Sequence, residues 1–248
     1  MAKKAAKSRG SIGRSAKKKG LSKKGAAQGR TALIAGASGL TGGHCLEFLL
    51  ESAYYATVHA LVRRPLGITH PKLREHVVDF NDPASVRRAA KADDVYCCLG
   101  TTIKKAGSQD AFRKVDYEYP VTLARESSAN GAKRFFIISA LGANPKSKIF
   151  YSRVKGEVER AVREFPFESV HVFRPSLLLG ERAEVRTAEK IGSALARVVG
   201  PVMVGPLRAY RAIEARAVAW AMVFSATAHL HGGVMESREM QALWEGRG

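Results

Sequence analysis

The sequence has 248 residues, 46% of them hydrophobic, and a formal net charge of +19. No apolar run approaches the roughly 20 residues that a membrane-spanning helix requires, and the N-terminus has no apolar segment of the kind found in signal peptides. The three cysteines, Cys45, Cys97 and Cys98, allow neither a disulfide framework nor a metal site. Composition therefore excludes membrane-spanning and disulfide-stabilised classes, and we expect a reducing, cytoplasmic location.

Residues 1–30 differ in composition from the rest of the chain. They contain 11 lysines and arginines, no acidic residue and no aromatic residue, so they carry more than half of the net charge. Such a segment buries too little apolar surface to offset the entropy of ordering it, and we predict a disordered basic tail. Three interpretations stay open: a solubilising tail, an added or targeting segment, or a weak, sequence-independent contact with nucleic acid or another anionic surface.

Residues 31–50 predict a strand, a glycine-rich turn and a helix. An apolar run at residues 33–35 leads into the sequence GASGLTG, and leucines at helical spacing follow it. Three glycines at this spacing allow a tight turn and the close approach of a pyrophosphate, to which the helix start offers free N–H groups. We predict that a dinucleotide binds to Gly36, Ser38, Gly39, Leu40, Thr41 and Gly42. The alternative is an ordinary strand–helix turn.

Strands and helices alternate from there to residue 175. The predicted strands cover residues 57–62, 76–80, 95–99, 135–139 and 169–173, and the predicted helices cover residues 82–90, 110–129 and 151–164. Repeated βα units of about 30 residues form parallel sheets with helices on both faces. The predicted fold class is therefore α/β, with a doubly wound parallel sheet.

The alternation stops after Pro175. Residues 177–180 and 188–199 do not continue the βα pattern, and one further helix is predicted at residues 214–229. In doubly wound sheets the ligand lies at the carboxyl ends of the strands, where a late irregular segment can cover the substrate. We predict one domain over residues 31–240, with a substrate-side segment at about 176–240 and a C-terminal tail at 241–248.

Two arginines end the second predicted strand, about 20 residues after the last glycine of the turn. A carboxylate at that place binds the ribose hydroxyl groups of NAD, whereas this chain has Arg63 and Arg64. Guanidinium groups match the oxygen atoms of a 2′-phosphate. The pair therefore favours NADP over NAD, with a solvated basic strand end as the alternative.

The end of the third predicted strand offers a candidate contact for adenine. Asp79 could accept a hydrogen bond from the adenine amino group, with the ring of Phe80 beside the base. Both residues could equally belong to a helix cap shared with Asn81 and Asp82. The sequence does not separate these two interpretations.

The end of the fourth predicted strand offers a candidate contact for the nicotinamide half of the cofactor. Gly100 has no side chain, so a ring or ribose can approach it closely. Its neighbours Leu99, Thr101 and Thr102 complete the predicted contact. A turn that simply ends the strand is the alternative.

A tyrosine and a lysine four residues apart form the candidate catalytic pair. Tyr151 and Lys155 share one face of the helix predicted at residues 151–164. The ordinary pKa of tyrosine is about 10, and a nearby ammonium lowers it, which makes the phenol a usable general acid–base near neutral pH. Ser139 ends the fifth predicted strand, and its hydroxyl could hold a substrate carbonyl. The Tyr–Lys spacing is common by chance, but here it follows a dinucleotide turn and a strand-ending serine.

Six segments of the chain resemble a known family: GASGLTG (36–42), CLGTTIKKAG (98–107), FRKVDYEYP (112–120), FFIISALGAN (135–144), FYSRVKGEVE (150–159) and FRPSLLLGER (173–182). Residues 31 to about 240 resemble the short-chain dehydrogenases/reductases of the extended or atypical type and, more narrowly, the Tat-interacting-protein-like oxidoreductases. This resemblance implies a Rossmann fold, bound NADP(H) and a catalytic set of Ser139, Tyr151 and Lys155, with Lys155 also holding the nicotinamide ribose. Many members have an asparagine that supports a proton relay near the place of Asp116.

Two functions follow as hypotheses. The first is an NADP(H)-dependent oxidoreductase that transfers hydride to or from a carbonyl or alcohol substrate, with Tyr151 protonating the oxygen. The second is an NADPH-binding regulatory or sensor protein with little turnover, acting through protein partners, because the resembled subfamily includes regulators. The set of Ser139, Tyr151 and Lys155 favours the first hypothesis, whereas Asp116 and the basic tail favour the second.

Overall fold

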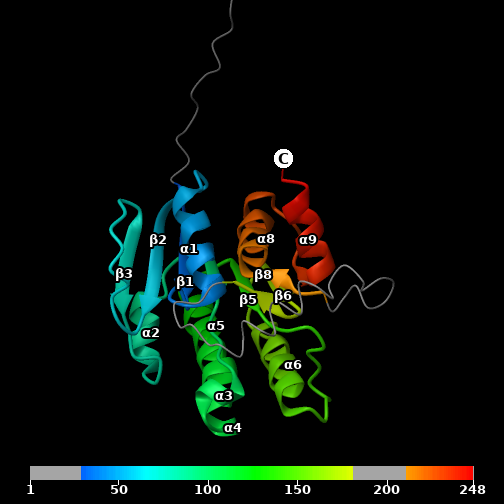
Figure 1. The fold of residues 1–248 in the computed structure, drawn as a ribbon. Coiled ribbons are helices and arrows are strands. Elements are labelled where there is room, and N and C mark those ends of the chain that lie inside the picture. Colours follow the sequence, from blue (N-terminus) through cyan, green and yellow to red (C-terminus); the bar gives the residue numbers. More distant parts are fainter. Residues whose placement is uncertain (1–28, 181–210, 248) are drawn as a thin grey trace, which may run out of the picture.

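The computed structural model describes residues 29–180 and 211–247 of the chain. The predicted tail lies outside the described residues apart from its last two positions, and so do residues 181–210 of the predicted substrate-side segment. The described residues form a parallel sheet with helices on both faces (Figure 1). This arrangement confirms the predicted α/β class.

Within residues 29–180 and 211–247, seven parallel strands form the central sheet in the order β3-β2-β1-β4-β5-β6-β9. The chain runs outward from β1 to β3 on one side and from β4 to β9 on the other, which is the order of a doubly wound Rossmann-like sheet. The strands are β1 (Arg30–Ala35), β2 (Tyr55–Val62), β3 (Leu73–Val77), β4 (Asp94–Cys97), β5 (Arg134–Ile138), β6 (Ser169–Arg174) and β9 (Gly233–Glu236). A separate pair joins β7 (Leu178–Leu179) to β8 (Ile213–Glu214).

Helices cover both faces of the sheet (Figure 1). One face carries α1 (Leu40–Glu51), α8 (Ala215–Thr227) and α9 (Ser237–Glu245). The other carries α2 (Pro83–Ala89), α5 (Tyr119–Ala129) and α6 (Phe150–Val162). Two short helices, α3 (Ile103–Ala106) and α4 (Gln109–Arg113), precede a π-helical turn, η1 (Lys114–Glu118), which leads directly into α5.

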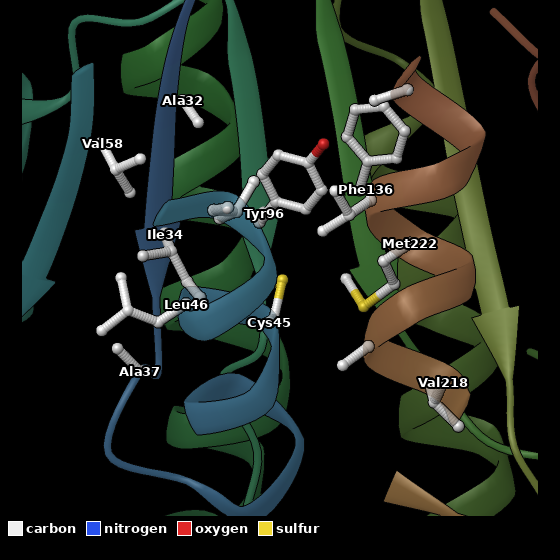
Figure 2. Packing of buried hydrophobic residues seen from close by; sticks show 14 of the residues in the cluster. Ala32, Ile34, Ala37, Cys45, Leu46, Val58, Tyr96, Phe136, Val218 and Met222 are labelled. Atoms are coloured by element: carbon white, nitrogen blue, oxygen red, sulfur yellow. The ribbon is translucent and has the colours of Figure 1, made fainter. Parts of the chain in front are cut away.

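Alternating strand residues fill two hydrophobic layers, one on each side of the sheet. On β1, Ile34 packs into the layer under α1 and α8, whereas Leu33 and Ala35 pack into the opposite layer, because successive strand residues point to opposite faces. Figure 2 shows the first layer, in which Ile34 faces Leu46 of α1 and Met222 of α8 closes the other side. All of these side chains are buried. The packed core therefore fixes the positions of the residues at the strand ends.

Three properties expected from composition can be compared with the structure. The cysteines are free thiols, with Cys97 in one hydrophobic layer and Cys98 against the other. In the part of the chain that the structure describes, no group of three or more side chains could hold a metal ion. No helix among residues 29–180 and 211–247 is long and apolar enough to cross a membrane. The cytoplasmic location stays a prediction.

The two edge strands differ from the prediction. β3 covers Leu73–Val77 rather than residues 76–80, because its side chains are mostly polar and partly exposed, whereas the apolar Val78 and Phe80 beyond it lie in the core. β9 has no counterpart among the predicted strands, since it is four residues long and lacks the apolar run that marks a strand. The chain after Pro175 therefore adds one more strand to the sheet, and α9 extends the folded domain into the predicted C-terminal tail.

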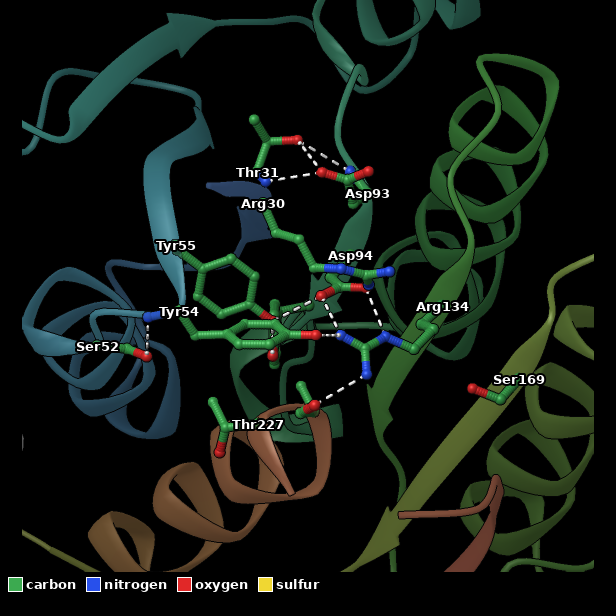
Figure 3. A network of polar contacts seen from close by, with 12 residues as sticks. Arg30, Thr31, Ser52, Tyr54, Tyr55, Asp93, Asp94, Arg134, Ser169 and Thr227 are labelled. Atoms are coloured by element: carbon green, nitrogen blue, oxygen red, sulfur yellow. Dashed lines mark hydrogen bonds and ion pairs between the residues drawn. The ribbon is translucent and has the colours of Figure 1, made fainter. Parts of the chain in front are cut away.

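A buried polar network ties the strands together at the edge of the sheet where they begin (Figure 3). The Arg134 guanidinium donates to both oxygens of Asp94, Nε to Oδ1 at 2.7 Å and Nη2 to Oδ2 at 2.5 Å. The Tyr55 hydroxyl donates to Asp94 Oδ2 at 2.7 Å and lies 2.7 Å from the Tyr96 hydroxyl. Burial and the neighbouring carboxylate raise the pKa of Tyr55, so its phenol stays a hydrogen-bond donor. The network joins β2, β4 and β5 far from their carboxyl ends.

Candidate functional site

The predicted dinucleotide turn lies between β1 and α1, and the backbone requires two of its glycines. Gly36 has a φ of +91°, and a Cβ atom there would stand 2.4 Å from the carbonyl oxygen of Cys98. A Cβ atom on Gly42, in the first turn of α1, would stand 2.0 Å from the carbonyl oxygen of Gly36. Both overlaps involve backbone atoms, which no side-chain movement can relieve. The absence of a side chain at Gly42 therefore lets the start of α1 lie close against the turn.

The first turn of α1 presents N–H groups at the carboxyl edge of the sheet. Gly39 is the N-cap residue and supplies no side-chain cap, and the first turn contains no acidic residue. Ser38 and Gly39 are exposed, and Leu40 and Thr41 follow as the first residues of the helix. The leading N–H groups of a helix lack partners within it and stand at its positive dipole end. This edge therefore suits a phosphate group.

Strand register places the other predicted cofactor residues on both sides of the turn. The last residue of β1 pairs with Leu61 on β2 and with Cys97 on β4. Arg63 and Arg64 follow Leu61 closely and are exposed, and residues 99–102 follow Cys97. The structure thus brings the arginines and the strand-end residues to opposite flanks of the glycine turn.

Asp79 and Phe80 lie beyond β3 rather than at its end. The Asp79 carboxylate accepts hydrogen bonds from the backbone N–H and the side-chain amide of Asn81, both at 2.8 Å, and these bonds lower the pKa of Asp79. The Phe80 ring is buried, with its centre 5.5 Å from that of the Tyr119 ring. Turn hydrogen bonds account for Asp79 and core packing accounts for Phe80, and the contact of these residues with adenine stays a prediction.

The residues after β4 are held by contacts of their own. Leu99 packs against the hydrophobic layer under α5 and α6, and the Thr101 N–H donates to Asp116 Oδ2 at 2.8 Å. The Thr102 hydroxyl accepts a hydrogen bond at 3.1 Å from the backbone N–H three residues later and thereby caps α3. Gly100 is exposed. What this segment offers a ligand is therefore mainly the open backbone at Gly100.

Tyr151 and Lys155 lie one turn apart on α6, as predicted. The Tyr151 ring packs against Phe112, with ring centres 5.5 Å apart. Lys155 is buried, and its Nζ lies 2.7 Å from Asp116 Oδ1, a buried carboxylate on η1. Burial alone would lower the pKa of Lys155, but Asp116 and the nearby Tyr151 raise it above its ordinary value. Lys155 is therefore a charged ammonium beside the candidate acid–base.

Ser139 lies directly after β5, but its proton is already engaged. The buried hydroxyl donates to Glu159 Oε1 at 2.5 Å. Arg174 donates to the same carboxylate from Nε at 2.9 Å and from Nη2 at 2.7 Å. A serine hydroxyl has one proton, so in this arrangement Ser139 has none to donate to a substrate carbonyl. The structure places Ser139 at the predicted edge, and its catalytic role stays a prediction.

Glu159 and Arg174 belong to this edge of the sheet and are absent from the predicted site residues. Tyr151, Lys155 and Glu159 are spaced by four, so α6 carries all three along one face. That repeat is a signal present in the sequence. Arg174 gives no such signal, because its contact with Glu159 joins β6 to α6 across the fold.

Similarity to known proteins agrees with this geometry. Residues 36–191 match a protein family described as NAD(P)H-binding. Protein HTATIP2 of Rattus norvegicus is 39% identical over 166 residues, which cover 65% of this chain and 68% of that protein. The mitochondrial protein fmp52 of Aspergillus fumigatus is 32% identical over 218 residues, which cover 85% of this chain and 92% of that protein.

Solved structures share the fold at low sequence identity. A short-chain dehydrogenase from Burkholderia cenocepacia, solved in complex with NADP, has a TM-score of 0.59 and 19% identity, covering 88% of this chain and 92% of that one. MoeE5, solved with UDP-glucuronic acid and NAD, has a TM-score of 0.64 and 19% identity, covering 86% of this chain and 80% of that one. At this identity the similarity concerns the fold alone.

Proposed function

The chain belongs to the NAD(P)H-binding family, and from this premise we propose that it is an NADP(H)-dependent oxidoreductase of the short-chain dehydrogenase type. The observation that carries the proposal is the gathering of three features at one edge of the sheet. These are the glycine turn with the start of α1, the exposed Arg63 and Arg64, and α6 with Tyr151 and Lys155. The substrate class is a carbonyl compound or the corresponding alcohol.

The residues at this edge fit the parts of the cofactor. The glycine turn and the N–H groups of α1 suit the pyrophosphate. A Cβ on Gly36 would overlap the backbone after β4, and a Cβ on Gly42 would overlap the backbone of the turn itself. Arg63 and Arg64 suit a 2′-phosphate, which distinguishes NADP from NAD. The open backbone at Gly100 and the ammonium of Lys155 suit the nicotinamide ribose.

In this proposal, the side chains of the protein transfer one proton in the reaction. When bound, the cofactor would supply or accept a hydride at the substrate carbon. Tyr151 donates its phenolic proton to the carbonyl oxygen in reduction and takes it back in alcohol oxidation. Lys155, charged and buried beside Tyr151, stabilises negative charge that develops on the phenol oxygen.

One observation favours a second function, an NADPH-binding protein with little turnover that acts through protein partners. Ser139 donates its only proton to Glu159, and Arg174 holds that carboxylate in place. A substrate carbonyl at this edge would then have Tyr151 as its donor without help from Ser139. Cofactor binding needs no serine, so it would survive this arrangement.

Turnover of a panel of aldehydes and ketones with NADPH, together with direct NADPH binding, tests the proposal. Tyr151→Phe should lower kcat by about 100-fold or more, because general acid–base catalysis contributes on that order, while the Kd for NADPH stays nearly unchanged. Tyr54→Phe is the matched control, because the Tyr54 hydroxyl lies at the opposite edge of the sheet against Arg134. NADPH binding without turnover of any carbonyl would select the second function, and absence of NADPH binding would exclude both.

A further inference from the structure

The π-helical turn η1 has a cause in the sequence, and it presents a buried aspartate. Pro120 has no N–H group, so it cannot donate to the carbonyl of Asp116 four residues earlier, as an α-helix would require. The N–H of Tyr119 instead bonds to the carbonyl of Lys114, five residues back. Asp116, the central residue of η1, is 1% exposed. Such turns recur at functional sites, and here the turn faces α6.

The Asp116 carboxylate joins three segments of the chain. Oδ2 accepts the Thr101 N–H at 2.8 Å, which fixes the turn after β4. Oδ1 lies 2.7 Å from Lys155 Nζ and, among the described residues, has no other polar partner. Gly100 lies against the pair, since a Cβ atom there would be 3.3 Å from Oδ1 and 3.8 Å from Nζ. An exposed glycine thus separates a buried charge pair from solvent.

The described groups that act on Lys155 come from three elements. They are Asp116 on η1, Tyr151 on α6 itself and Cys97 on β4. Burial raises the pKa of the Cys97 thiol to about 12, so this group is neutral at physiological pH. Among the described residues, Asp116 therefore supplies the negative charge that balances the buried ammonium.

The two carboxylates on the same stretch of α6 pair elsewhere. Glu157 forms an ion pair with Arg113 of α4 at 2.5 Å, and Glu159 is held by Arg174 and Ser139. Both carboxylates thus have arginine partners and not the lysine. A neutral amide at position 116 could still accept the N–H of the strand-end turn, but it would leave the ammonium buried without a counter-charge.

We infer that Asp116 is the positioning residue of this site, whose carboxylate keeps Lys155 charged and holds its ammonium close behind the exposed Gly100. An ammonium has three N–H donors, so donors remain for hydroxyl groups of a ligand that enters past the glycine. The identity of that ligand as the nicotinamide ribose rests on the proposed function. Two consequences follow: Lys155 does not act as a neutral amine, and its contribution to ligand binding is constant up to alkaline pH.

The test is a pH titration of the Lys155 side chain in the full-length chain. The titration is monitored by NMR of protein labelled with ¹³C at the lysine ε-carbon. Lys155→Arg identifies the signal by its disappearance. In the wild-type protein the midpoint should lie above the ordinary lysine value of about 10.4. In Asp116→Asn it should fall by about 1 to 3 pH units, because burial then acts without the opposing carboxylate. An unchanged midpoint in Asp116→Asn overturns the inference.

Two further measurements separate this inference from a purely structural role. Asp110→Asn removes an exposed carboxylate from the same helical stretch and should leave the Lys155 midpoint in place; an equal fall in both variants overturns the inference. The Kd for NADPH should stay flat with pH in the wild-type protein. In Asp116→Asn it should rise about tenfold per pH unit above the new midpoint, as proton linkage requires.

The wild-type titration can decide the inference even without the variant. If Asp116→Asn does not fold, the wild-type midpoint decides alone, and a value below that of free lysine overturns the inference. If the wild-type protein binds no NADPH, the proposed function fails, whereas the lysine titration still decides the role of Asp116.

Discussion

The two edges of the parallel sheet each bury one aspartate paired with a cation, and the two pairs are built differently. Where the strands begin, Asp94 pairs with Arg134 (Figure 3). Where they end, Asp116 pairs with Lys155. Both carboxylates are essentially closed to solvent. Burial therefore does not distinguish the pairs, and the difference lies in the groups around them.

The pair where the strands begin is saturated with hydrogen bonds. Arg134 binds Asp94 through two nitrogens and also donates to the carbonyl of Ala226 at 2.9 Å and to the Tyr54 hydroxyl at 3.0 Å. Tyr55 donates to Oδ2, the carboxylate oxygen that Arg134 Nη2 also binds. Such a pair has no capacity left for a ligand. Its role is to hold β2, β4 and β5 and the end of α8 in one arrangement.

The pair where the strands end is left open. Among the described residues, Asp116 Oδ1 has no polar partner besides Lys155 Nζ at 2.7 Å, and the exposed Gly100 lies against the pair. Taking a charge out of water is unfavourable unless it is both paired and hydrogen-bonded. An incompletely satisfied buried pair is therefore a candidate binding feature. The two pairs therefore differ in the number of their hydrogen-bond partners rather than in their burial.

The largest expected effect comes from breaking the saturated pair. Asp94→Ala leaves the Arg134 guanidinium buried without its carboxylate, and we expect a loss of about 3–5 kcal/mol in the free energy of unfolding. Denaturant titration measures this loss. The Kd for NADPH of the folded fraction should not change, because the network lies at the edge opposite the cofactor turn.

A neighbouring carboxylate provides the matched control for that prediction. Asp93 bonds to the backbone N–H and the hydroxyl of Thr31 but is only half-buried, so Asp93→Ala should have an effect of about 1 kcal/mol. A similar loss in both variants would mean that the saturated network has no special role. Replacing both partners, as in Asp94→Leu with Arg134→Met, should restore much of the stability, since apolar replacements of buried pairs are often neutral.

A smaller effect is expected from a methyl group at the glycine turn. Gly42→Ala places Cβ 2.0 Å from the carbonyl oxygen of Gly36, so α1 must move, which we expect to reduce stability by about 1–3 kcal/mol and to abolish NADPH binding. Gly43→Ala is the matched control, because its Cβ would stand 3.6 Å from the nearest atom, the carbonyl oxygen of Ala37. This control should be neutral or slightly stabilising. Equal NADPH affinity in the two variants contradicts the prediction.

The smallest change in stability is expected at the exposed arginines. Replacing Arg63 and Arg64 together with Ala should leave the free energy of unfolding within about 0.5 kcal/mol, because both side chains are exposed. NADPH affinity should fall by on the order of 1.5–3 kcal/mol as charged hydrogen bonds to the phosphate are lost, whereas NADH affinity should stay unchanged. Calorimetric titration with both nucleotides measures the difference, and equal losses for the two would remove the arginines from cofactor selection.

Much of the fold could be predicted because its signals are local. Apolar runs, their spacing and the glycine turn indicated the order of βα units, and the doubly wound sheet confirms it. The edge strands β3 and β9 could not be placed in the same way. They are short and partly polar, and their pairing with β2 and β6 supplies what their own sequences lack. An interior strand can be predicted from the apolar run in its own sequence, whereas an edge strand depends on pairing with the neighbouring strand.

The sequence by itself determined which residue types stand at the ends of the strands and along α6: a glycine turn, two arginines, and Tyr151, Lys155 and Glu159 at a spacing of four. Only the tertiary structure decided how those groups are engaged. It pairs Lys155 with Asp116 and gives the proton of Ser139 to Glu159. The physical reason is that spacing along one helix or turn follows from local geometry, whereas a hydrogen bond between residues on different elements depends on how the packed sheet and helices bring distant segments within 3 Å.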